Sequence, residues 1–335
     1  MDLRVGDVVE VRGEDEIRAT LDERGELDGL PFMPEMLRFC GRRMTVRKVA
    51  HKACDTIDHT GLRRMDDAVH LTGARCDGAA HGGCQTACSL YWKAAWLKKA
   101  APPAAPSQPP AVPSPPAAAP ERGARLLPLL EANTHKPPGP HGEERFSCQA
   151  TELLRAAPRP LPVKDLRQYV TDVRTGNAGV LKTLLGLFLA VFNRYQALST
   201  RLLPRWLRIR GGLKWGWVPA GEPGPTPTGT LDLQPGELVR IKSRREIVAT
   251  LNHERLNRGL GFEEEMARHC GRTARVVARV ERCLDERTGE LLLMKNPCIT
   301  LESVFCEGAY SVNCPRQFLP FWREIWLERV EESGS

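Results

Sequence analysis

The sequence has few aromatic residues and lacks the short motifs that mark common catalytic and nucleotide-binding sites. Aromatic residues make up 6% of the 335 positions, which leaves few side chains for the base-stacking surfaces of nucleic-acid binders. No G-x-x-x-x-G-K-[ST], G-x-G-x-x-G, G-x-S-x-G or H-E-x-x-H motif occurs. The chain therefore gives no indication of a phosphate loop, a dinucleotide site, a serine nucleophile or a zincin site, and no catalytic residue is indicated.

The sequence also has no long apolar run and no secretory pattern at its start. Its longest apolar stretch, 180–192, contains one charge, Lys182, and would form about 20 Å of helix, too short to span a bilayer. Residues 1–7 include no basic segment followed by an apolar one. We expect a cytoplasmic protein whose thiols stay reduced. The net charge of +7 permits an anionic partner without requiring one.

Cysteine, in contrast, is plentiful, and it recurs with a fixed offset. The chain has 11 cysteines, and clustered thiols in a reduced protein bind metal or perform redox chemistry more often than they form disulfides. A shift of 230 residues aligns the two ends of the sequence, which indicates a duplicated domain. Identical residues occupy these pairs of positions: Glu35 and Glu265, Cys40 and Cys270, Cys76 and Cys306, Cys84 and Cys314, Trp92 and Trp322, Trp96 and Trp326.

Each copy reads as a small α+β domain of SH3-like or small-barrel character. Valine-rich alternation at 4–12 predicts an opening strand. Turns centred on Asp58 and Thr288 predict two hairpins that would set Cys40 opposite Cys76, and Cys270 opposite Cys306. The tryptophan pairs four residues apart predict that each copy is closed by a C-terminal helix, at 89–99 and 315–330.

The composition predicts five segments. Residues 1–100 and 232–335 are the two cysteine-rich repeat domains, 101–145 is a disordered Pro/Ala-rich linker, and 219–231 is a short linker. Between the linkers, 146–218 is a helical segment in which an apolar run precedes several arginines and tryptophans. This segment fits either a helix packed between the copies or a helix lying in a membrane interface. We therefore expect a protein partner or a membrane surface to bind 146–217, and possible peripheral membrane association.

The repeated cysteines predict two metal sites, because thiolates are soft ligands for zinc and for iron–sulfur clusters. The equivalent trios are Cys40, Cys76, Cys84 and Cys270, Cys306, Cys314. Cys88 lies one helical turn after Cys84 and completes the first set most easily. Further candidate ligands are Cys54, His81, Cys283 and Cys298. The first copy contains more histidines, so we expect it to be the functional one.

Three functions remain open on this pattern. Structural zinc in a binding or scaffold protein is preferred. An iron–sulfur protein acting in electron transfer or as an oxidoreductase is the alternative, because such clusters tolerate scattered single cysteines. A nucleic-acid-binding small barrel is a weaker alternative: basic residues at 42–48 could contact phosphates, but acidic residues are interspersed. Nucleic acid is therefore not the expected partner.

Overall fold

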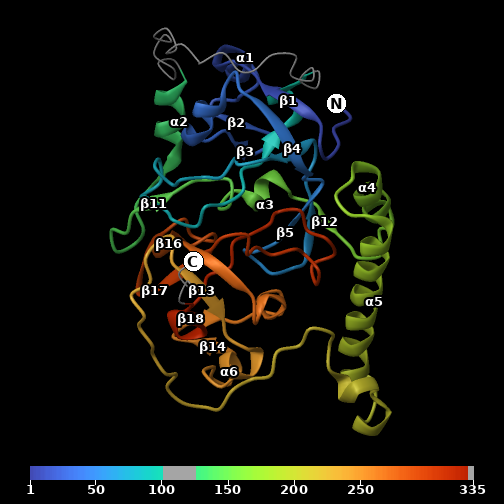
Figure 1. Ribbon diagram of the computed structural model, residues 1–335. Coiled ribbons are helices and arrows are strands. Elements are labelled where there is room, and N and C mark those ends of the chain that lie inside the picture. Colours follow the sequence, from blue (N-terminus) through green and yellow to red (C-terminus); the bar gives the residue numbers. More distant parts are fainter. Residues whose placement is uncertain (101–125, 331–335) are drawn as a thin grey trace, which may run out of the picture. The chain divides into compact units, whose positions relative to one another are not determined.

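The computed structural model describes residues 1–100 and 126–330, which form a mixed α+β structure of small antiparallel sheets with few helices (Figure 1). The mixed class predicted from the sequence is confirmed. The chain divides into two compact units. Unit 1 contains 1–177 together with 284–291, and unit 2 contains 178–283 together with 292–335. Residues 101–125 of the predicted linker lie outside the described residues.

The main sheet of unit 1 has five strands in the order β8-β7-β4-β1-β9. Valine alternation places Val9 and Val11 of β1 in the core, as expected for a strand with one buried face. The strands are β1 (Val8–Val11), β4 (Arg43–Val49), β7 (Ala68–Leu71), β8 (Trp92–Lys93) and β9 (Leu97–Lys99). Around it lie α1 (Glu14–Arg18), β2 (Glu26–Leu27), β3 (Leu30–Pro31), the 3₁₀ helices η1 (Pro34–Phe39) and η2 (Ala94–Trp96), β5 (Lys52–Cys54) and β6 (Leu62–Arg64).

Unit 2 has a four-stranded sheet in the order β17-β16-β13-β18. Its core gathers Trp322, Trp326, Phe262 and Ile247 with the inner faces of the strands. The elements are α5 (Val180–Leu202), η3 (Arg205–Leu207), η4 (Ile209–Gly212), β13 (Leu238–Ile241), α6 (Arg244–Val248), β14 (Leu256–Asn257), β15 (Leu260–Gly261), η5 (Met266–His269), β16 (Thr273–Leu284), β17 (Leu291–Leu301), η6 (Glu324–Trp326) and β18 (Leu327–Arg329).

The strand registers of the two units correspond at a shift of 230 residues. Val9 faces Lys99 in unit 1, and Val239 faces Arg329 in unit 2. The indole of Trp96 donates to the Thr20 hydroxyl at 3.1 Å, and that of Trp326 donates to Thr250 at 2.9 Å. Each unit therefore surrounds its tryptophan core with the same hydrogen-bond arrangement.

The predicted C-terminal helices at 89–99 and 315–330 are wrong. The first segment forms β8, η2 and β9, and the second contains η6 followed by β18. β9 and β18 pair with the opening strands β1 and β13, which satisfies backbone groups that a helix would leave unpaired. Because the 3₁₀ turn between Trp92 and Trp96 reverses the chain, both indoles reach the core without an α-helix.

The first predicted hairpin has the expected pairing only near its tip. Cys54 faces Leu62, as a turn centred on Asp58 requires. A bulge between Val46 and Lys48 then shifts the register towards the base of the hairpin. Cys40 is the C-terminal cap of η1 and lies before β4, so the predicted ladder position opposite Cys76 is not formed. Cys270 likewise caps η5, before β16 begins.

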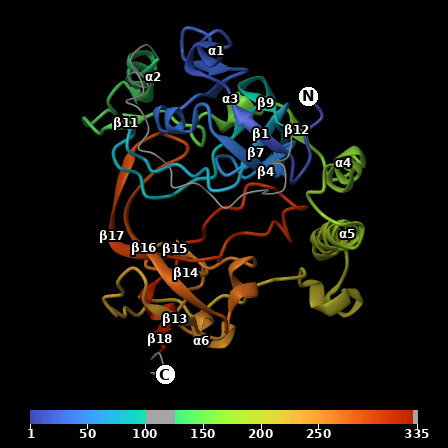
Figure 2. The same ribbon diagram turned by 45° about the horizontal axis from the view of Figure 1, so that its top comes forward.

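The middle of the chain contributes to both units. Residues 126–145, predicted as part of the linker, contain α2 (Leu127–Thr134) and β10 (His135–Lys136), which precede β11 (Arg145–Phe146). α3 (Leu153–Ala156), β12 (Pro160–Leu161) and α4 (Arg167–Thr175) complete unit 1. α5 has 23 residues, more than the apolar run alone predicted (Figure 2). Among the described residues, no helix combines the length and apolar character needed to cross a bilayer.

Candidate metal centre

A tight loop at 76–84 builds the candidate site in unit 1. The Gly78 carbonyl accepts the backbone N–H of His81 at 3.1 Å and that of Gly83 at 2.9 Å. Gly78 has φ +72°, and a Cβ atom there would lie 2.0 Å from the carbonyl oxygen of Cys84. Only glycine fits such a close approach of two backbone segments. The fold of the loop thereby places His81 and Cys84 beside Cys76.

Glu35, from η1, enters the same site. The group Glu35, Cys76 and His81 could hold a metal ion, because one ligand atom from each lies within 4.8 Å of the others. Cys76 Sγ is 3.5 Å from His81 Nε2, and Glu35 Oε1 is 3.0 Å from His81 Nδ1. The third separation, from Cys76 Sγ to Glu35 Oε1, is 3.9 Å. A tetrahedral zinc ion with bonds of 2.0–2.3 Å would require ligand separations of about 3.3–3.8 Å, close to this spacing.

Two polar atoms of this buried site have no hydrogen-bond partner among the described residues. They are Glu35 Oε2 and His81 Nδ1. The other carboxylate oxygen of Glu35 accepts the backbone N–H of Ala80 at 3.1 Å, which ties η1 to the loop. Buried polar atoms are rarely left without a partner, and coordination of a metal ion would satisfy both of these atoms.

The site couples an imidazole to thiols and a carboxylate. Burial alone would lower the pKa of His81, but its contacts with Cys76, Cys84 and Glu35 raise that pKa well above its ordinary value. Burial raises the pKa of Cys84, and the contacts with His81 and Thr86 outweigh it, so that pKa lies below the ordinary thiol value. At Cys76 burial prevails and the pKa is raised. The arrangement therefore favours a thiolate at Cys84 beside a cationic His81.

The equivalent loop of unit 2 keeps the backbone but lacks the imidazole. The Gly308 carbonyl accepts the N–H of Ser311 at 3.1 Å and that of Asn313 at 2.8 Å, which matches the bonds of Gly78. Glu265 Oε1 accepts the N–H of Tyr310 at 2.8 Å, in the position of Glu35. Ser311 occupies the place of His81, and burial raises the pKa of Cys306 to about 12. Without metal, Cys306 therefore stays a neutral thiol.

The other predicted ligands lie in several places. In unit 1, the Cys88 carbonyl accepts the N–H of Cys76 at 2.9 Å, and Cys54 ends β5. Cys40 and Cys270 cap 3₁₀ helices, and the metal-compatible group does not include them. In unit 2, Cys314 belongs to the Ser311 loop. Cys283 and Cys298 lie on β16 and β17, and Cys298 is buried against the Arg323 guanidinium at 3.3 Å.

The sequence did not identify Glu35 as a site residue. The pattern did contain a clue, since Glu35 recurs as Glu265 at the same offset as the cysteines. Carboxylates are common on protein surfaces, however, and only the packing of η1 against the loop buries this one.

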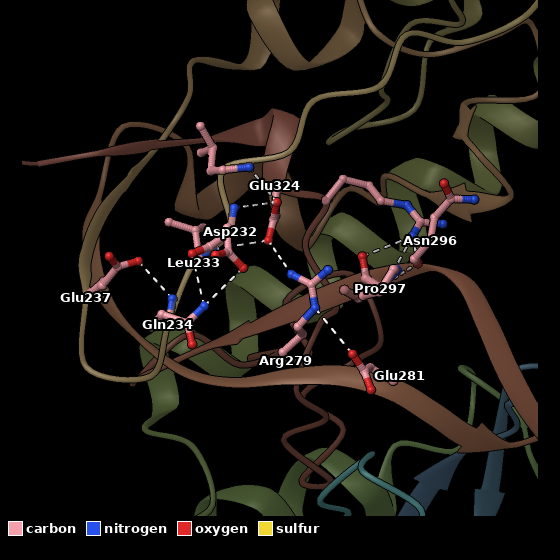
Figure 3. Close-up of polar contacts among 12 residues, drawn as sticks. Asp232, Leu233, Gln234, Glu237, Arg279, Glu281, Asn296, Pro297 and Glu324 are labelled. Carbon is pink, nitrogen blue, oxygen red and sulfur yellow. Dashed lines mark hydrogen bonds and ion pairs between the residues drawn. The ribbon is translucent and has the colours of Figure 1, made fainter.

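A polar cavity of about 180 Å³ in unit 2 is a second concave region. Arg279 in its wall donates to Glu324 Oε1 at 2.7 Å, and Glu324 accepts the backbone N–H of Asp232 at 3.2 Å and that of Leu233 at 3.4 Å (Figure 3). Arg323 donates to the carbonyl of Arg258 at 2.8 Å. These two arginines and this carboxylate are thus engaged by the protein itself, and they fasten 231–233 to η6.

Comparison with known proteins adds no relative to these observations. No protein-family model, no curated protein and no solved structure matches the chain.

Proposed function

We propose that the protein is a zinc-binding protein in which Glu35, Cys76 and His81 are ligands and the Cys84 thiolate is the fourth. The observation that carries this proposal is the buried clustering of a carboxylate, a thiol and an imidazole in unit 1. Sulfur, nitrogen and oxygen donors together are typical of zinc. Such an ion would join η1 to the 76–84 loop and stabilise the domain, as structural zinc does.

An iron–sulfur cluster is supported less well. Such clusters are held by four thiolates, with histidine replacing some of them in one class. The metal-compatible group contains the Cys76 thiol, and Cys84 contacts its histidine. Cys40 and Cys88, predicted as ligands, are not in that group. The electron-transfer alternative would require both to move into the site.

The recurrence in the sequence, the strand registers and the loop bonds at a shift of 230 residues supports a duplicated domain with diverged sites. On this proposal the first copy binds zinc, because it retains His81. The second copy acts as a scaffold, because Ser311 replaces that ligand.

A thiol reaction is the second candidate, favoured by the lowered pKa of Cys84 beside His81. A cysteine nucleophile needs a histidine next to it and a carboxylate behind the histidine. Glu35 and His81 could supply these groups. Cys84 is buried, however, which keeps a substrate from its sulfur and ranks this function below zinc.

The test is the metal content of the purified full-length protein. We expect about one zinc per chain, lost in Cys76→Ser and His81→Ala and retained in the control Cys298→Ser. Iron with visible charge-transfer absorption would replace the zinc proposal with the cluster. Absence of any metal, together with rapid alkylation of Cys84 by iodoacetamide, would instead support thiol chemistry.

A further inference from the structure

The two faces of α5 are reversed relative to an ordinary surface helix. Its buried side carries small and polar residues, including Thr183, Gly186 and Gln196. The apolar side chains face outward at helical spacing, and Leu181 is 82% exposed. The other exposed apolar residues of the helix are Val180, Leu184, Leu185, Phe188, Val191, Leu198 and Leu202. A soluble helix normally turns such a stripe to the core, so a patch of this size marks an interaction surface.

The charge of this region defines the chemistry of its partner. Residues 178–217 contain seven cations, counted from the sequence, and no aspartate or glutamate. The cations are Lys182, Arg194, Arg201, Arg205, Arg208, Arg210 and Lys214. Most follow the apolar stripe, where Trp206 is 81% exposed. Trp215, also exposed, contacts the Arg210 guanidinium, whose carbon lies 4.8 Å from the centre of the ring.

We propose that the surface formed by α5, η3 and η4 binds an anionic lipid bilayer, with α5 lying in the plane of the interface. Its 23 residues form about 35 Å of helix. An outward apolar face, a cationic flank and exposed tryptophans are the features of interfacial helices. Pairing with a second copy is disfavoured, because it would bring seven cations against seven with no carboxylate between them.

Direct polar contacts hold the surface in shape within unit 2. Gln196 donates to the carbonyl of Ile209 at 2.7 Å and to that of Leu213 at 3.0 Å. Asn193 Oδ1 accepts the N–H of Trp215 at 2.6 Å. The polar side of α5 thus fastens the basic segment to the helix, and the apolar side is left for the bilayer.

Sedimentation of the full-length protein with lipid vesicles tests the proposal. We expect binding to vesicles of phosphatidylcholine mixed with phosphatidylglycerol, and much weaker binding to phosphatidylcholine alone. Each cation near an anionic surface contributes about a fivefold change in partitioning. Arg201→Glu and Arg205→Glu should therefore each weaken binding by at least that factor, and added salt should weaken it further. Arg245→Glu, at an exposed site on α6, is the matched control.

The apolar contribution needs its own variant. Phe188→Glu should abolish binding, whereas Leu293→Glu, at an exposed apolar site on β17, should leave it unchanged. With anionic vesicles, the tryptophan emission should shift to shorter wavelength, and Trp206→Phe should reduce that shift. Equal binding by Phe188→Glu and the parent protein would overturn the proposal. So would a stable dimer that does not bind vesicles.

Discussion

Glu152 shows how a single carboxylate fastens the middle segment into unit 1. Its oxygens lie 2.7 Å from Lys136 Nζ and 2.8 Å from Arg155 Nη1. The Ser147 hydroxyl donates to it at 3.0 Å. Burial raises the pKa of Glu152, but these partners outweigh burial and lower the pKa to about 2. One side chain thereby joins β10, α3 and the segment between them.

The lowered pKa of Glu152 predicts a loss of stability in acid. Because the folded-state pKa lies below the ordinary value of 4.5, the stabilisation is complete above that pH and is lost as the pH falls towards about 2. Glu152→Gln should lower the free energy of unfolding at neutral pH by roughly 1–3 kcal/mol, the range for charged hydrogen bonds. It should also flatten the pH dependence between 4.5 and about 2.

Urea denaturation of the parent protein and the variant across this pH range measures both effects. Glu131→Gln, at an exposed position on α2, is the matched control and should change neither. An equally steep acid loss in Glu152→Gln would assign the effect to other carboxylates.

At the scale of elements, side-chain amides take the place of backbone partners. Gln149 accepts the N–H of Tyr91 at 2.8 Å and donates to the Tyr91 carbonyl at 2.9 Å. Asn177 treats Val49 in the same way, accepting its N–H at 2.8 Å and donating to its carbonyl at 2.7 Å. Each amide satisfies one residue of the unit 1 sheet region, so the middle segment docks without adding a strand there.

These amides should be important for stability. Gln149→Ala would leave the buried backbone groups of Tyr91 without their partners, at a cost of about 1–3 kcal/mol. Asn177→Ala should have a similar effect through Val49. Gln234→Ala, at an exposed site in unit 2, should change the free energy of unfolding by less than about 0.5 kcal/mol. Chemical denaturation of the three variants makes the comparison. A Gln149→Ala variant as stable as the parent would mean that water replaces the amide.

The elements also show what the sequence could and could not predict. Valine alternation correctly placed β1, and the turn at Asp58 correctly paired Cys54 with Leu62. The tryptophan spacing failed, because a 3₁₀ turn between two short strands buries the same indoles as a helix would. That choice depends on β9 pairing with β1, a contact between residues almost 90 positions apart that no local pattern contains.

The candidate site was predictable to the same partial extent. Cys76 and Cys84 were found because their spacing recurs in the second copy. His81 was only one of several possible ligands, since its position in the second copy is a serine. Cys40 shared the recurrence but caps η1, and the metal-compatible group contains Glu35 from that helix instead. Periodicity finds repeated residues, whereas the loop around Gly78 decides which of them converge.

At the scale of the whole molecule, two units share one loop but differ in a single potential ligand. Glu265, Cys306 and Cys314 occupy the positions of Glu35, Cys76 and Cys84. The Gly308 carbonyl repeats the hydrogen bonds of Gly78, so the backbone of the second loop matches the first. If zinc binding depends on the imidazole, the second unit needs only that group to acquire it.

Ser311→His should therefore raise the metal content from about one to about two zinc per chain. The new imidazole would lie between the Cys306 and Cys314 thiols and the Glu265 carboxylate, as His81 does in the first unit. The bound ion would then lower the pKa values of these thiols, which burial raises in Cys306. Metal analysis of dialysed protein gives the count, and Ser311→Ala is the matched control that should add none. A folded Ser311→His variant that still binds a single ion would show that the two loops differ in more than this ligand. Zinc binding in the first unit would then depend on groups outside the set shared by both units.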